Sequence, residues 1–204
     1  YCVPIAAHIV RKSDGTGGLP LSQLDQAMLD ANAYFADTGM SFYLLSIDYI
    51  DSDAYYFDVD TNAEIAALKG ENVVSDAINI YFTPNLSNED GGLCGISSFT
   101  TSAVQGIAMA NGCTGTASNP SSYPHEIGHY FDLYHTHETA FGAELVDGTN
   151  CGAAGDLGAG AGSSEFAKPD KIVVHFLLQT MISLVSRVPF NAPTPGKGVR
   201  LPLE

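Results

Sequence analysis

The segment His125-Glu-Ile-Gly-His129, followed six residues later by His135, constrains this chain more than any other part of its sequence. On an α-helix, residues four positions apart lie about 40° apart and one turn above each other. His125 and His129 can therefore both direct an imidazole at one ion, at the ~2.0–2.1 Å that is usual for Zn–N bonds. The sequence predicts a helix at this segment that carries part of a metal site.

The residue types in this segment are those of a catalytic zinc site. Three neutral imidazoles leave one zinc position open for water, and bound zinc lowers the pKa of that water toward ~7. Glu126 lies on the same helical turn and can accept the water proton as a general base. We therefore predict that His125, His129 and His135 bind Zn²⁺ and that Glu126 is catalytic.

Other side chains are candidates for the third ligand. His137 and Glu138 follow His135 closely, and Glu144 or Glu165 would complete a site of two histidines and a glutamate. The spacing favours His135.

Two other polar features are interpreted without a metal. His8 lies in an apolar run and is predicted to be a core residue. Asp58-x-Asp60-x-Asn62 begins like a calcium loop, but that loop requires Gly and Glu where this chain has Ala63 and Lys69. A solvated turn that leads into a helix cap is favoured here, so no motif supports Ca²⁺ as a cofactor.

The composition is that of one globular domain, with or without a small second lobe. The chain has 204 residues, of which 45% are hydrophobic, and a formal net charge of −15. Phosphates would be repelled by this charge, which argues against nucleic acid as a partner. No apolar run approaches the ~20 residues of a membrane span. Because the chain begins at Tyr1 without a leader, we expect a mature form or an excised domain whose targeting segment is not visible. The composition is typical of extracellular proteins, so a secreted or extracellular location is expected.

The charge is unevenly distributed along the chain. Residues 1–156 contain 20 acidic and three basic side chains, whereas residues 157–204 contain three acidic and five basic ones. We therefore expect a first domain over residues 1–156 and an atypical segment over 157–204.

Four cysteines allow three full pairings, and the sequence cannot select one. None has C-x-x-C spacing. At least one disulfide is favoured, and Cys94–Cys113 is the best single prediction because these residues bracket two expected strands.

The pattern along the chain predicts alternating strands and helices. Strands are expected over residues 3–10, 41–50, 77–83, 94–100 and 106–111, and helices over residues 22–37, from Thr61 to Lys69, and from Ser121 onward. Within residues 41–50, Tyr43, Leu45, Ile47 and Tyr49 are expected on one face. This order indicates an α/β layered fold.

The segment from His125 to His137, His-Glu-Ile-Gly-His-Tyr-Phe-Asp-Leu-Tyr-His-Thr-His, resembles the metzincin zinc proteases and, among them, the pappalysin (cytophagalysin) family. The resemblance covers residues 2–156. It implies an α/β (α+β) fold in which a mixed, mostly parallel five-stranded sheet packs on two long helices, with a small irregular C-terminal lobe. It also implies that an edge strand binds extended peptide, and it assigns the same zinc ligands and base as the spacing does.

The chain departs from that family in two places. Asp132 stands where the family has Gly, at the bend that returns the third histidine to the metal. Beyond Asp156 the family's Asp-Thr-Pro segment is missing, and Met181 is the only candidate for the methionine turn beneath the zinc. Residues 157–204 are either a divergent lobe or the product of a shifted reading frame near Leu157.

The sequence favours a zinc-dependent endopeptidase that acts on peptides or proteins. The alternative is a zinc-binding module, or an inactive protease homologue, that lacks turnover. Serine and cysteine hydrolases are disfavoured because no G-x-S-x-G motif is present and no cysteine has an evident histidine partner. The oligomeric state is left open.

Overall fold

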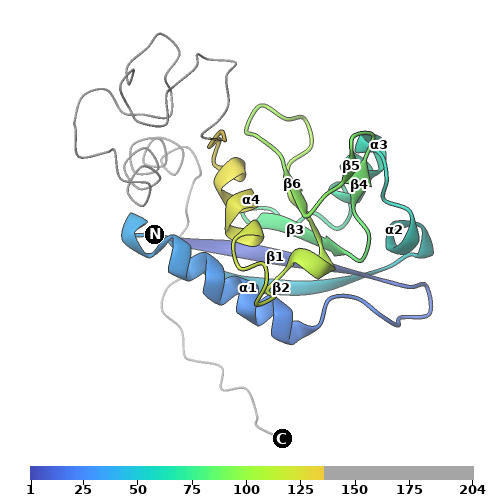
Figure 1. Cartoon of the computed structure of the whole chain (residues 1–204), viewed down its shortest axis with the longest axis horizontal. Coiled ribbons are helices and arrows are strands. Elements are labelled where there is room, and N and C mark those ends of the chain that lie inside the picture. Colours follow the sequence, from blue (N-terminus) through green and yellow to red (C-terminus); the bar gives the residue numbers. More distant parts are fainter. Residues whose placement is uncertain (136–204) are drawn as a thin grey trace, which may run out of the picture.

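Five strands form one sheet in the order β2-β1-β3-β7-β6 (Figure 1). A computed structural model describes residues 1–135 of the chain. The first four strands of this order are parallel to one another, and β6 pairs antiparallel with β7. The expected mixed, mostly parallel five-stranded sheet is therefore confirmed, and β6 forms one of its two edges.

The elements alternate along the chain much as the pattern predicted. Their bounds are β1 Cys2–Arg11, α1 Leu21–Tyr34, β2 Ser41–Asp51, α2 Asp53–Phe57, α3 Asn62–Leu68, β3 Ile78–Thr83, β4 Ser87–Asn88, β5 Gly91–Gly92, β6 Gly95–Ser97, β7 Ile107–Ala110 and α4 Ser122–Tyr130. Single 3₁₀ turns at Ala36–Thr38 and Asn111–Cys113 follow α1 and β7.

Each face of the sheet is buried against its own set of elements. One apolar cluster joins the sheet to α1 and α4, through side chains such as Leu24, Ala31, Tyr123 and Ile127. The other cluster joins the opposite face to α3 and its flanking loops, through Ile65 and Leu68 among others. Burial on both faces explains why the interior strand β1 is an almost continuous apolar run.

The start of α1 differs from the sequence expectation. The sequence predicts Ser22 as the N-cap, but the helix begins at Leu21 with Pro20 as its N-cap, two residues before Ser22. Proline fits this boundary because its fixed φ angle suits the entry to a helix and its missing N–H leaves no donor unpaired. The helix also ends earlier than expected, at Tyr34 rather than at residue 37, and Gly39, with a left-handed φ of 72°, ends the 3₁₀ turn that follows it.

Strand β2 contains a bulge that the alternating pattern did not predict. Its pairing with β1 passes from Ile5–Leu44 to Ala6–Ser46, so Leu45 has no partner. An unpaired extra residue shifts the alternation by one. Phe42 therefore packs in the cluster beside α1, and Ile50 packs in the cluster on the opposite face. The expectation that Tyr43 shares a face with Ile47 and Tyr49 is wrong for this reason.

Several predictions concern residues that lie outside the described range. They are the segment 157–204, the end of the 1–156 domain, the candidate methionine turn at Met181, the fourth cysteine Cys151, and the rival ligands His137, Glu138, Glu144 and Glu165.

Within residues 1–135, no helix has the length and hydropathy that a membrane crossing needs.

Candidate metal centre

Helix α4 carries the first two histidines on the side that faces away from the core. Tyr123 and Ile127 are buried against the sheet and α1, which fixes the rotation of the helix. The helix begins at Ser122, and Pro124 occupies its third position rather than the first. With this rotation, His125 is exposed and His129 is half-buried, and both imidazoles reach the solvent-facing side.

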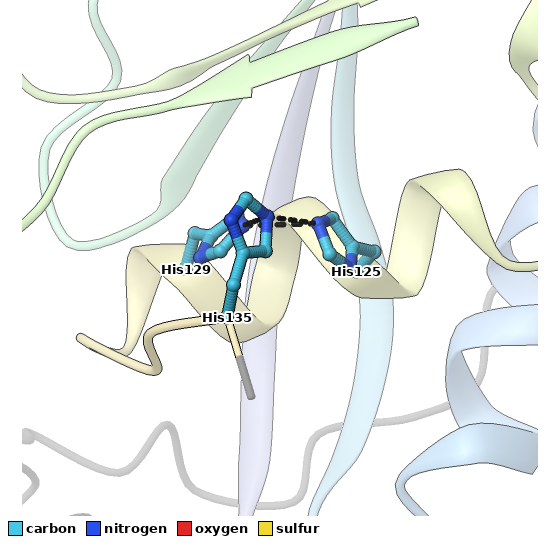
Figure 2. Close-up of side chains that lie close together, drawn as sticks. All are labelled: His125, His129 and His135. Atoms are coloured by element: carbon cyan, nitrogen blue, oxygen red, sulfur yellow. Dashed lines mark hydrogen bonds between the residues drawn. The ribbon is translucent and has the colours of Figure 1, made fainter. Parts of the chain in front are cut away.

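The three predicted histidines converge on one point, as Figure 2 shows. The Nε2 atoms are 2.9 Å apart between His125 and His129, 3.0 Å between His129 and His135, and 3.2 Å between His125 and His135. Two nitrogens bound to one tetrahedral zinc ion would be about 3.3–3.4 Å apart. The observed triangle is slightly smaller than this, so the donor set fits a single small cation.

A sharp turn after α4 returns His135 to the other two histidines. The amide of Leu133 donates to the carbonyl of Gly128 at 3.1 Å, and the amide of Asp132 donates to the carbonyl of His129 at 2.8 Å. This pair of hydrogen bonds, with a left-handed residue directly after the C-cap of the helix, is a Schellman motif. Asp132 is that residue, with φ 63°. The chain reverses here without a glycine.

The same turn orients the ring of His129. Its Nδ1 lies within hydrogen-bonding distance of the carbonyl oxygen of Leu133. A carbonyl can only accept, so Nδ1 carries the proton, and the neutral ring presents the lone pair of Nε2 to the other histidines. Burial lowers the pKa of both His125 and His129, and the neighbouring His135 lowers it further. Neutral imidazoles with inward lone pairs are the form that binds a metal.

Glu126 lies beside the histidines but points toward β6. Only 7% of its surface is exposed, and burial raises its pKa to about 7, against the opposing effects of the Lys69 charge and a hydrogen bond from the Ser97 backbone. Gly95 makes this position available, because a Cβ there would lie 2.6 Å from the Glu126 Cγ atom. The carboxyl group therefore faces the site without belonging to the histidine triangle.

Lys69 is a residue that the sequence analysis missed. It is 5% exposed, and its Nζ donates to the Ser98 hydroxyl at 3.2 Å. Burial lowers its pKa to about 8, although the Glu126 charge acts in the opposite direction. The sequence pattern predicts Lys69 at the end of a helix and at a position that breaks the calcium-loop pattern, and no local signal indicates a buried lysine behind the site.

A cleft of about 530 Å³ contains the histidines and Glu126. Edge strand β6 forms one wall, and Phe99 and Tyr134 line it as well. A disulfide between Cys94 and Cys113, with Cα atoms 5.3 Å apart, anchors the residue immediately before β6. The predicted pairing is thus confirmed, and it lies directly beside the candidate centre.

The features that were interpreted without a metal lie elsewhere. His8 is fully buried, its Nε2 is 2.9 Å from the Asn79 Oδ1 atom, and its ring stacks on Tyr81. The prediction of a core histidine is confirmed. Thr61 and Glu64 form the expected capping box at the start of α3.

The chain is similar in sequence to several proteins named extracellular metalloprotease. An extracellular metalloprotease of Pyricularia oryzae is 29% identical over 170 residues, which are 76% of this chain and 58% of that protein. A protein of the same name from Colletotrichum graminicola is 30% identical over 164 residues, 71% of this chain and 56% of that protein. The one from Arthroderma benhamiae is 30% identical over 138 residues, 62% of this chain and 49% of that protein.

Two solved structures superpose weakly on part of the chain. Metalloproteinase-II from Bacteroides fragilis superposes with a TM-score of 0.42 and 14% identity, over 67% of this chain and 44% of that one. A chaperone–substrate complex superposes with a TM-score of 0.48 and 19% identity, over 69% of this chain and 28% of that one. No protein-family model matches the chain.

The chain spans about half the length of the curated relatives it matches. Its place in the pappalysin family stays a prediction, as do the individual roles of His125, Glu126, His129 and His135. At the coarser level, the names of the relatives support a metalloprotease family for this chain, and with it a bound metal.

Proposed function

We propose that this chain is a secreted, zinc-dependent endopeptidase of the pappalysin type that cleaves peptide bonds within extended polypeptides. The observation that carries the proposal is the convergence of three histidine Nε2 atoms in a cleft that also contains a buried carboxyl group. The extracellular names of the relatives support secretion.

His125, His129 and His135 would hold the zinc ion. When bound there, zinc supplies an acidified water and polarises the scissile carbonyl. The hydrogen bond from His129 to the Leu133 carbonyl holds that ring in one tautomer and one orientation, which is the usual role of a partner behind a metal-binding histidine. The protein thus orients the His129 nitrogen toward the site before the ion arrives.

Glu126 would move the proton in the reaction. Its carboxylate accepts a proton from the attacking water and returns it to the nitrogen of the leaving amine, so one group serves as base and then as acid. Its placement against Gly95 keeps it out of the histidine triangle, where it would otherwise compete as a ligand. The position therefore suits proton transfer better than metal binding.

Strand β6 would bind the substrate. Among residues 1–135 it is an edge strand that pairs with β7 on one side only, and it lines the same cleft as the histidines. An edge strand can accept an extended peptide as an additional strand, with main-chain hydrogen bonds that do not depend on peptide sequence. This arrangement would align a peptide bond beside Glu126.

The test measures zinc content and cleavage of a mixed peptide library for the full chain and for Glu126→Gln. We expect one zinc ion per chain in both proteins and a loss of cleavage of about 10²–10⁴-fold in the variant. Asp25→Asn on the exposed side of α1 is the matched control, and it should cleave normally.

The alternative is a zinc-binding module without turnover. It would be favoured by one bound zinc ion together with no cleavage that depends on Glu126. That result would be either no cleavage at all or the same cleavage in the wild type and in Glu126→Gln, which Glu126 then does not catalyse. A chain that binds no zinc would contradict both functions.

A further inference from the structure

Asp132 occupies a backbone conformation that favours glycine. Its φ angle of 63° lies in the left-handed region, which Asp and Asn tolerate better than other non-glycine residues but less well than Gly. If the turn needed only this backbone shape, glycine would serve it better. The presence of Asp rather than Gly at position 132 therefore requires an explanation that involves its side chain.

The Asp132 carboxylate binds a residue that is 32 positions away in the sequence. The backbone N–H of Thr100 donates to Oδ1 at 2.8 Å, and the Thr100 hydroxyl donates to Oδ2. Both carboxylate oxygens are thus used by one residue. Thr100 belongs to the loop of residues 98–106, which connects β6 to β7 and is termed the β6–β7 loop below.

The β6–β7 loop contributes an aromatic side chain to the candidate centre. Phe99, the neighbour of Thr100, has its ring 5.7 Å from the His129 ring and stacks on Tyr134 at 5.1 Å. Its carbonyl accepts a hydrogen bond from the Gln105 side chain, which braces the loop from within. Phe99 therefore lies against one histidine and against the residue immediately before His135.

We propose that Asp132 is a positioning residue whose carboxylate ties the β6–β7 loop to the turn after α4. By binding Thr100 it holds Phe99 against His129 and Tyr134, and so keeps the segment that carries His135 folded back toward the other histidines. The inference rests on the proposed zinc function for its effect on affinity, while the tie between loop and turn can be measured without any metal.

Three substitutions separate the effect of the Asp132 carboxylate from the effect of the left-handed backbone conformation. Asp132→Gly relaxes the left-handed turn but removes the tie. Asp132→Asn keeps a side chain that tolerates the same φ, accepts from the Thr100 N–H and donates to its hydroxyl. Thr100→Val removes the hydroxyl from the other end. Asp76→Gly is the matched control, because Asp76 also has a positive φ, of 61°, but is exposed and lies on the turn before β3.

Two readouts are used on the full chain. The first is hydrogen exchange of the Thr100 amide in the metal-free protein, and the second is zinc affinity by competition with a chelator. For Asp132→Gly we expect exchange to become about tenfold faster and zinc affinity to fall about tenfold, the lower end of the range for residues behind metal ligands. Thr100→Val should show part of the affinity loss, and Asp132→Asn and Asp76→Gly should remain close to wild type.

The opposite result is equally informative. Zinc affinity that is unchanged or improved in Asp132→Gly would overturn the inference, because it would mean that only the backbone of residue 132 matters. If the wild-type chain binds no zinc, the proposed function is wrong, and hydrogen exchange of the Thr100 amide alone tests the link between Asp132 and the β6–β7 loop. Faster exchange in Asp132→Gly would support this link, and unchanged exchange would overturn it.

Discussion

His129 donates a hydrogen bond from its ring to the carbonyl of Leu133, four residues further along the chain. Leu133 also closes the Schellman motif through its own amide, which donates to Gly128. One residue therefore ends the helix and orients a histidine of the candidate centre. The candidate metal site and the turn after α4 are therefore one local structure.

Substitution of His135 by Ala should lower zinc affinity by about 10²–10³-fold. This range follows if a total binding free energy of about 10–16 kcal/mol is shared among four ligand positions. Competition with a chelator measures it. His137→Ala is the control, since His137 is the rival ligand just beyond the described residues. Loss of affinity in His137→Ala with normal binding in His135→Ala would assign the third ligand to His137.

Substitution of Gly95 by Ala should reduce kcat about 10²-fold while zinc remains bound. The new Cβ would lie 2.6 Å from the Glu126 Cγ and 2.7 Å from the Met109 sulfur, so the carboxyl group must move. Displacement of a catalytic group by about 1 Å can have an effect of this size. Steady-state kinetics and zinc content together measure it.

Gly92→Ala is the matched control for Gly95→Ala, because a Cβ at Gly92 would have no atom within 4 Å. If Gly95→Ala retains full kcat, the close approach of β6 to Glu126 has no role in catalysis.

Lys69 should make the stability of the metal-free protein depend on alkaline pH. Burial lowers its pKa from 10.5 to about 8, so between these values the unfolded chain binds more protons than the folded one. The free energy of unfolding should therefore rise as pH increases from 8 to 10.5, and the destabilisation should be fully present below pH 8. Lys69→Met should remove this dependence and stabilise the protein at pH 7 by up to about 3 kcal/mol.

Urea unfolding of the wild type and Lys69→Met at several pH values measures this difference. Lys12→Met is the control, since Lys12 is partly exposed near Tyr56 and should not change the slope. Parallel stability curves for wild type and Lys69→Met would show that the buried ammonium is not destabilising.

Loss of the Cys94–Cys113 disulfide should destabilise the protein by about 3 kcal/mol. The two residues are 19 positions apart, and a loop of that length loses roughly this much chain entropy when it is closed in the unfolded state. Denaturant unfolding should give the same loss for Cys94→Ser, for Cys113→Ser and for the double variant. Losses that add in the double variant would mean that the two cysteines act separately.

Much of the fold was predictable because it depends on local periodicity. The apolar run of β1, the capping box of Thr61 and Glu64 and the left-handed stop at Gly39 are each specified within a few residues. The bulge at Leu45 was not predictable, because it is a feature of the pairing between β2 and β1. An alternating pattern in one strand contains no information about which residue its neighbour leaves unpaired.

The sequence by itself determined the chemistry of the candidate centre. The four-residue spacing of His125 and His129 acts through the helical repeat, which brings these side chains together in any helix. The tertiary structure alone decided what surrounds them: Glu126 against Gly95, Lys69 buried beside Ser98, and Thr100 bound to Asp132. These contacts join segments 29 to 32 positions apart, and they exist only because the packed sheet places β6 and its loop beside α4 and beside the end of α3.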